Sequence, residues 1–214
     1  MKNKIFTLNE LIIVIACLGL TATLMLGAAT SAKSAQAACL ANLKNIGGAI
    51  SAYAADSDGY PPVVFQAGKW ESSWCLDNQF VTYLKLKPTR APEKFRTRGN
   101  VLECPADDPA EHFTKVGYVM NGSLLTLAEN GSRREGGKIS SFSAPAKTLA
   151  VMDGVQFVAY SWCAAADDKN RTRARHEGDL DVLFLDGSTG SAKGVVSALE
   201  NYDAKRSWKS DNDL

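Results

Sequence analysis

The feature that most constrains the fold is a run of 19 residues, 11–29, that carries no charge and nothing more polar than threonine. At ~1.5 Å per residue, a helix over residues 6–29 would be about 36 Å long, enough to cross a hydrocarbon core of about 30 Å. Lys2 and Lys4 precede the run, and positive charges hold a short flank on the cytoplasmic side. The sequence therefore predicts one membrane-spanning helix, with the rest of the chain outside the cytoplasm.

The composition fits a membrane segment joined to one globular domain. The chain has 214 residues, of which 45% are hydrophobic and 22% are charged, values that are ordinary for a folded protein. Its formal net charge is +1, so no overall field favours a strongly charged partner. We therefore expect no nucleic-acid binding from charge.

A cleaved secretory signal is the alternative interpretation of the N-terminus. Ala35 and Ala37 supply the small-residue pattern of a signal-peptidase site. The apolar part of a signal peptide usually runs over about 7–15 residues, however, and the run here is longer. An acid at its leading edge, Glu10, is also unusual in a signal peptide, so this alternative is the less favoured one.

The letters FTLNEL at residues 6–11, behind a short basic leader, resemble the N-terminal signature of type IV prepilins and type II secretion pseudopilins. The resemblance implies that a prepilin peptidase cuts between Ile5 and Phe6 and methylates the new amino terminus of Phe6. It also implies that the apolar helix is retained and packs with other pilin or pseudopilin subunits in a filament. Ile5 and Asn9 depart from the family pattern, which usually has glycine and an apolar residue at these positions.

Glu10 becomes the fifth residue of the mature chain under this resemblance. A carboxylate inside a membrane helix costs ~2.5–3.5 kcal/mol on insertion scales, so it needs a partner or a proton. In a filament, the cationic amino terminus of a neighbouring Phe6 can supply that partner and set the axial register between subunits. The alternative is that Glu10 only reaches the cytoplasmic interface; the resemblance favours the assembly role.

The predicted helix continues beyond the membrane, because no proline occurs before Pro61. An apolar stripe at spacings of three and four residues indicates an amphipathic continuation. The pair Gly47-Gly48 weakens the helix and indicates a bend or a close approach, and the letters DSDGYPP at residues 56–62 end it. The stripe consists of Cys39, Leu43, Ile46, Ile50 and Tyr53.

After residue 62 the sequence changes to short apolar runs separated by turns. Four runs predict strands, VGYVMNG, TLAVMDG, QFVAYSW and DVLFLDG, and three of them close on Asn-Gly or Asp-Gly, the strongest short hairpin signal. We also expect a loop at residues 85–99 and a short helix at residues 195–202. The predicted class is α+β, a pilin-like fold in which a long N-terminal helix packs on an antiparallel β-sheet head.

The predicted organisation has four parts. A leader peptide covers residues 1–5, the transmembrane helix residues 6–30, its amphipathic continuation residues 31–58, and a soluble head residues 59–214. The resemblance places such a protein in the bacterial inner membrane with a single pass and a cytoplasmic N-terminus. Its head would be periplasmic or part of an extracellular filament.

His176 and the pair Asp186-Gly187, separated by nine residues, are similar to a C-terminal signature of prepilin-type proteins with heads of this kind. The similarity implies membership and no chemistry. His112 is the only other histidine, no second ligand lies at a metal spacing from either, and no EF-hand pattern is present. We therefore predict no metal and no cofactor, with His176 bonded to backbone and Asp186 shaping a turn. No catalytic motif is present, so we expect no enzyme.

The cysteines suggest disulfides. Cys17 lies in the predicted membrane helix, and the other four would face an oxidising periplasm, which allows two bridges in three connectivities. The resemblance implies a Cys39–Cys104 bridge, because related heads carry cysteine at both positions. The letters SWCLD and SWCAA around Cys75 and Cys163 look like an added pair.

The leading functional interpretation is a structural subunit of a pilus or a type II secretion pseudopilus-like filament, processed before Phe6 and assembled through its N-terminal helix. The choice among secretion pseudopilus, type IV pilus and DNA-uptake filament stays open, as does that between major and minor subunit. One alternative is a membrane-anchored periplasmic binding module that uses the prepilin-type leader for insertion. The other is a secreted protein with a cleaved signal peptide.

Overall fold

The computed structural model describes a helix and most of a small head. The predicted short helix at residues 195–202 and all but the ends of the predicted loop at residues 85–99 lie outside the described residues. Side chains of residues 19–30 are likewise outside the description. The described residues are 8–66, 69, 73–76, 79–87, 99–107, 116–122, 124–127, 130, 132, 137–155, 158–159 and 174–193.

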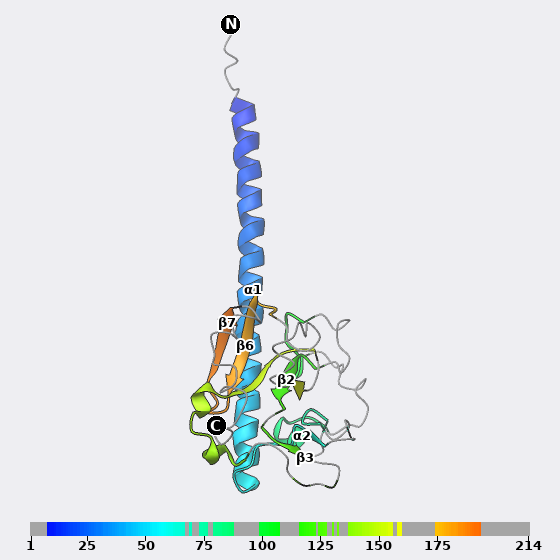
Figure 1. Cartoon of the computed structure of the whole chain (residues 1–214). Coiled ribbons are helices and arrows are strands. Elements are labelled where there is room, and N and C mark those ends of the chain that lie inside the picture. The colour runs from blue at the N-terminus through cyan, green and yellow to red at the C-terminus, as the bar shows by residue number, and fades with distance from the viewer. Residues whose placement is uncertain are drawn as a thin grey trace.

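Helix α1 runs over Leu8–Asp56. Its first part projects from the head and its last part runs alongside the sheet (Figure 1). The helix ends where the sequence predicts, because Asp58 and Gly59 adopt φ values of 54° and 82° and the Gly59 N–H donates to the Ala54 carbonyl at 2.8 Å. Left-handed residues of this kind close the last turn of a helix. Within the described part of the chain, no helix combines the length and apolarity needed to cross a membrane.

Five strands form the main sheet, in the order β5-β2-β4-β6-β7. A separate pair, β1 and β3, is parallel, and one short α-helix, α2, and two 3₁₀ turns, η4 and η5, complete the described elements. Their bounds are β1 Phe65–Gln66, α2 Phe80–Tyr83, β2 Tyr118–Asn121, β3 Thr126–Leu127, η4 Ile139–Ser141, η5 Pro145–Lys147, β4 Leu149–Asp153, β5 Val158–Ala159, β6 Asp179–Phe184 and β7 Thr189–Lys193.

The α+β class is confirmed, and so is an antiparallel sheet, which consists of β2, β4, β6 and β7. Strand β5 extends this sheet and is parallel to β2, which the sequence did not predict. Strand β5 cannot pair with β4, because β4 already has β2 on one edge and β6 on the other. The chain that leaves β4 therefore passes beyond β2 before it pairs again.

One of the three predicted hairpins forms. Asp186-Gly187 joins β6 to β7, and Gly187 has the positive φ of 84° that such a turn requires. The Asp186 Oδ1 accepts hydrogen bonds from the Ser188 N–H at 2.9 Å and its hydroxyl at 2.6 Å, so Asp186 shapes the turn as predicted. These two hydrogen bonds lower the pKa of Asp186.

The predicted apolar stripe of α1 lies in the core. Cys39, Leu43 and Ile46 are fully buried, and Ile50 and Tyr53 nearly so; each large apolar side chain contributes about 1.5–3 kcal/mol when buried. The helix packs against β6 at Gly47, where a Cβ atom would lie 2.9 Å from Leu183 Cδ1. The glycine pair therefore marks a close approach of helix and sheet, which was one of the two predicted alternatives.

Candidate functional site

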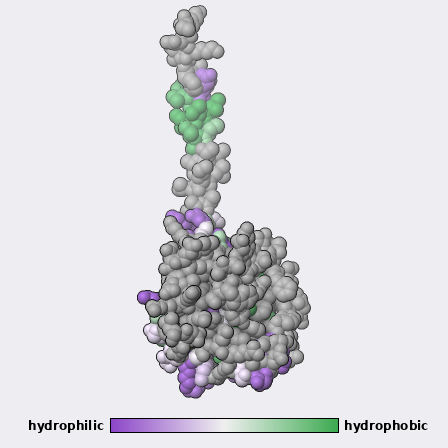
Figure 2. All heavy atoms as spheres, in the orientation of Figure 1, coloured by the Kyte–Doolittle hydropathy of each residue, from purple (hydrophilic) through white to green (hydrophobic). Residues whose placement is uncertain are grey.

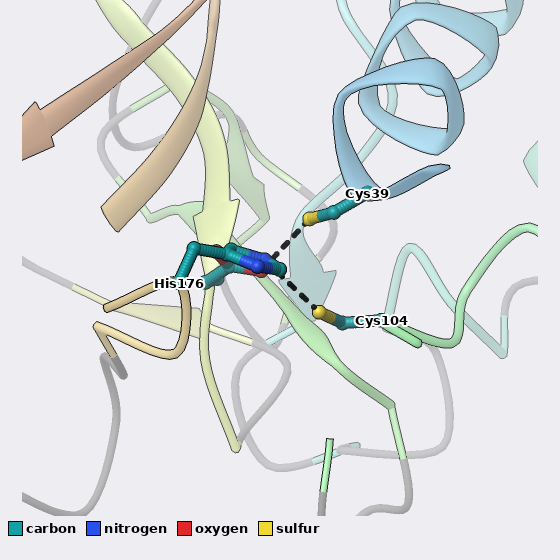
Figure 3. A group of neighbouring side chains, drawn as sticks. Cys39, Cys104 and His176 are labelled. Carbon is teal, nitrogen blue, oxygen red and sulfur yellow. Dashed lines mark hydrogen bonds and ion pairs between the residues drawn. The ribbon is translucent and has the colours of Figure 1, made fainter. Parts of the chain in front are cut away.

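Four buried side chains that can bind a metal meet where α1 crosses the sheet: Cys39, Cys104, Asp153 and His176. One ligand atom from each lies within 4.8 Å of all the others. They come from α1, from a turn before β2, from the end of β4 and from the bridge that precedes β6. Figure 3 shows both thiols on the same side of the His176 imidazole and pointing toward it, Cys39 from the helix and Cys104 from a separate segment. We call these four residues the Cys/Asp/His cluster.

The Cys104 turn is fastened to its surroundings by two contacts. The Asn42 side-chain amide on α1 donates to the Glu103 carbonyl at 2.8 Å, and the Gly117 N–H donates to the Leu102 carbonyl at 2.8 Å. Gly117 packs so closely that a Cβ atom there would lie 2.6 Å from the Cys104 nitrogen. A side chain at this position would push the thiol away from its neighbours.

Asp153 links the helix to the strands. Its Oδ1 accepts a hydrogen bond from the Cys39 thiol at 3.2 Å, and its Oδ2 accepts one from the Asp181 N–H at 3.1 Å. Tyr118, its partner across the β2–β4 ladder, donates its hydroxyl to the Cys39 sulfur at 3.4 Å. The carboxylate is therefore held between α1, β4 and β6.

His176 is held by a tight turn. Its backbone N–H and carbonyl both pair with Asp179, and the two residues between them, Glu177 and Gly178, have φ values of 56° and 92°. Positive φ at both central positions is the mark of a type I′ turn. The turn directs the His176 Nε2 toward the cluster, where it faces side chains and not the backbone group that we expected the imidazole to bond.

The Nε2 atom of His176 faces three potential partners. It lies 3.4 Å from the Cys104 sulfur, 3.6 Å from Asp153 Oδ2 and 3.5 Å from Asp181 Oδ2. Asp181 Oδ1 accepts hydrogen bonds from Gln36 at 3.2 Å and from the Ser191 hydroxyl. Asp181 Oδ2 is buried and accepts no hydrogen bond from the described residues.

Arg175 is the cation next to the cluster, and its side chain is only 7% exposed. It pairs with Asp107 at 2.8 Å and donates to the carbonyls of Gly117 and Gly154, both at 2.9 Å. One guanidinium nitrogen lies 3.6 Å from Asp153 Oδ1. Arg175 therefore compensates part of the negative charge that the cluster can carry.

The cluster disfavours charge on its own members. Burial raises the pKa of the Asp153 carboxyl to about 7, although Arg175 opposes the shift. Contact with Cys104, together with burial, raises the pKa of the Cys39 thiol well above its usual range. Burial lowers the pKa of His176. Several acidic groups crowded into one buried space cannot all ionise without a cation among them.

The Cys39–Cys104 disulfide stays a prediction. The two residues lie together, as the resemblance implied, and both are free thiols in this structure. Each sulfur also contacts another group: Cys39 contacts Asp153, and Cys104 contacts His176. Cys75 is also a free, buried thiol, next to the Ser73 hydroxyl at 3.5 Å; its predicted partner Cys163 lies outside the described residues.

The other predicted site residues lie away from the cluster. Asp186 and Gly187 lie at the opposite end of β6 from His176, so the nine residues between the signature positions span one strand and its flanks. Glu10 lies on the projecting part of α1 and is exposed. Ile5 and Phe6 lie outside the described residues.

Sequence reasoning misses Asp153, which it interprets only as the first residue of an Asp-Gly turn. It considers Asp181 as one of the acids close to His176 in sequence and sets aside a metal site there. No spacing rule could have joined Asp153 to His176 and the thiols, because the four residues of the cluster come from four separate segments. The available signal was an acidic residue in each apolar strand, Asp153 at the end of β4 and Asp181 within β6, both of them fully buried.

Comparisons of the chain with known protein families, with curated proteins and with solved structures found no match.

Proposed function

We propose that this chain is a structural subunit of a pilus or type II secretion pseudopilus-like filament, cut before Phe6 and assembled through its N-terminal helix. The proposal places it in the bacterial inner membrane before assembly, with prepilin peptidase and other subunits as partners. It is a structural role and not an enzymatic one.

The observation that carries the proposal is the exposed apolar surface of the projecting part of α1. Figure 2 shows this surface as a green segment outside the head. Five consecutive apolar residues, 11–15, are all exposed, so the helix is apolar on every side, which is typical of helices covered by lipid or by other helices. The exposed residues are Leu8, Leu11, Ile12, Ile13, Val14, Ile15 and Leu18, at 43–72%.

The resemblance of residues 6–11 to the prepilin signature supports a filament over a simple anchor. An anchor needs only apolar length, whereas Glu10 adds a carboxylate at the edge of the apolar surface. A cationic amino terminus of a neighbouring subunit would pair with this carboxylate and fix how far one helix slides along the next.

The test compares Glu10→Ala and Glu10→Gln with Asn9→Ala in cells that carry a prepilin peptidase and a filament assembly system. Asn9 is the matched control, because it is the neighbouring polar residue and is also exposed. We expect both Glu10 variants to reach the membrane in normal amounts, since they remove a charge from hydrocarbon. The sheared filament fraction should fall at least about tenfold, which corresponds to ~1.4 kcal/mol of lost pairing, and Asn9→Ala should assemble normally.

Intact mass of the membrane-extracted protein gives the second readout. Loss of residues 1–5 with the gain of one methyl group is the expected result. Normal filament assembly in both Glu10 variants would refute the assembly role, and a mature chain beginning near residue 38 would refute processing before Phe6.

A further inference from the structure

We propose that the Cys/Asp/His cluster binds one zinc ion, with Cys39 Sγ, Cys104 Sγ, His176 Nε2 and an Asp153 carboxylate oxygen as ligands. The ion would be structural, because all four positions of a tetrahedron are filled by protein groups. This inference does not depend on filament assembly.

The donor set is the first support. Two sulfurs, one imidazole nitrogen and one carboxylate oxygen are all zinc ligands, and softer thiolates favour zinc over magnesium or calcium. The four side chains are between 0% and 5% exposed. Burial of polar and ionisable side chains costs free energy unless they are hydrogen-bonded, paired or bound to a metal.

The distances between ligand atoms are the second support. With Zn–S bonds of about 2.3 Å and Zn–N or Zn–O bonds of about 2.0–2.2 Å, neighbouring ligand atoms of a tetrahedral site lie about 3.3–3.8 Å apart. Cys104 Sγ lies 3.4 Å from His176 Nε2, Cys39 Sγ lies 3.2 Å from Asp153 Oδ1, and His176 Nε2 lies 3.6 Å from the other oxygen, Asp153 Oδ2. One ligand atom from each of the four residues lies within 4.8 Å of the others, so rotation of the Asp153 carboxylate would bring a single oxygen to the ion.

Asp181 supplies an independent observation. Its Oδ2 is fully buried, accepts no hydrogen bond from the described residues and points at His176 Nε2 from 3.5 Å. A buried carboxylate oxygen in this position needs positive charge nearby. A zinc ion bound to Nε2 would place that charge next to Asp181, while Gln36 and Ser191 hold its other oxygen.

The outer contacts of the site are those that metal ligands commonly have. Tyr118 donates its hydroxyl to the Cys39 sulfur at 3.4 Å, and the Asp181 N–H donates to Asp153 at 3.1 Å. Arg175 lies 3.6 Å from Asp153 and adds positive charge outside the ligands. Such contacts orient the ligating atoms and stabilise a negatively charged zinc site.

The binding test uses the full chain in detergent micelles, purified without chelator, loaded with Zn²⁺ and desalted. We expect about one zinc per chain by elemental mass spectrometry, as for a single four-ligand site. Titration with Co²⁺ should give the thiolate-to-cobalt and d–d absorption bands of a tetrahedral site. Cys39→Ser, Cys104→Ser and His176→Gln should each weaken Zn²⁺ binding at least about tenfold.

Cys75→Ser is the matched control, because Cys75 is a buried thiol in the same head but lies outside the cluster. It should keep one zinc per chain and the Co²⁺ bands. A wild-type stoichiometry well below one zinc per chain would overturn the proposal. Loss of zinc from Cys75→Ser to the same extent as from the cluster variants would overturn it as well.

A measurement on the wild-type chain covers the case in which cluster variants fail to fold. The chain is denatured with a chelator but no reductant, alkylated, and mapped by peptide mass spectrometry. Alkylation of both Cys39 and Cys104, with zinc bound beforehand, is the expected result. Cysteines that react only after a reductant is added would show a disulfide, which excludes the zinc site, and free thiols without bound Zn²⁺ would exclude it as well.

Discussion

The energetic cost of crowding the contact between α1 and the sheet can be measured by comparing substitutions at two adjacent glycines of α1. Gly47 and Gly48 sit in the same helix, and replacement of either by alanine should gain the same ~0.8–1.0 kcal/mol of helix propensity. Their surroundings differ. A Cβ atom at Gly48 meets nothing within 4 Å, whereas one at Gly47 would lie 2.9 Å from Leu183 Cδ1 and 3.6 Å from the Gly187 Cα.

The expected outcomes are therefore opposite. Gly48→Ala should raise the free energy of unfolding by about 0.8–1.0 kcal/mol, because nothing opposes the propensity gain. In Gly47→Ala the added methyl must displace Leu183, which is fully buried, and overpacking of a core costs ~1–3 kcal/mol. The difference between the two variants, ~1–3 kcal/mol, isolates this contact because the helix contribution cancels.

The assay is chemical unfolding of the full chain in micelles, followed by the fluorescence of its tryptophans, among which Trp74 is fully buried. Leu183→Val provides a rescue, because it shortens the displaced side chain. The effect of Leu183→Val on the free energy of unfolding should be at least about 0.5 kcal/mol more favourable in the Gly47→Ala background than in the wild type, because contacting residues couple. Equal stabilities of Gly47→Ala and Gly48→Ala would refute the close approach.

Two further predictions concern charge and metal. Arg175→Ala should lower the free energy of unfolding by ~3–5 kcal/mol, because it breaks a buried ion pair with Asp107. Lys138 is the control, since its ion pair with Asp58 is exposed, and Lys138→Ala should lower the free energy of unfolding by only ~0–1 kcal/mol in the same assay. Equal losses of stability in the two variants would contradict this account of Arg175. If the zinc site forms, Zn²⁺ at about 100 times its dissociation constant should stabilise the chain by ~2.7 kcal/mol, so a chelator should lower the melting temperature of the wild type more than that of Cys104→Ser.

The local features of the fold could be predicted from the sequence. The buried stripe of α1 follows from helical periodicity, and the end of the helix at Asp56 follows from the Asp58-Gly59 turn. Strands β2, β4 and β6 follow from apolar, β-branched runs. The Asp186-Gly187 hairpin follows from turn chemistry, which acts within a few residues.

The long-range features could not be predicted in this way. The same Asp-Gly signal fails after β4, because both edges of that strand are occupied by other strands. Strand β7 was not predicted, since its letters TGSAK carry few apolar residues and its pairing with β6 decides its conformation. The Cys/Asp/His cluster depends on all of these placements at once, so ligands that are unremarkable in sequence become neighbours only when the sheet forms.

The continuity of α1 has a mechanical consequence. The helix runs from Leu8 to Asp56 with no break, and at ~1.5 Å per residue the distance along its axis from Glu10 to Cys39 is about 44 Å. A pull or twist applied near Glu10 would therefore be transmitted along the hydrogen-bonded turns of the helix. It would reach the buried side chains of Cys39, Leu43 and Ile46, so the packing of these side chains would determine how much tension the head resists.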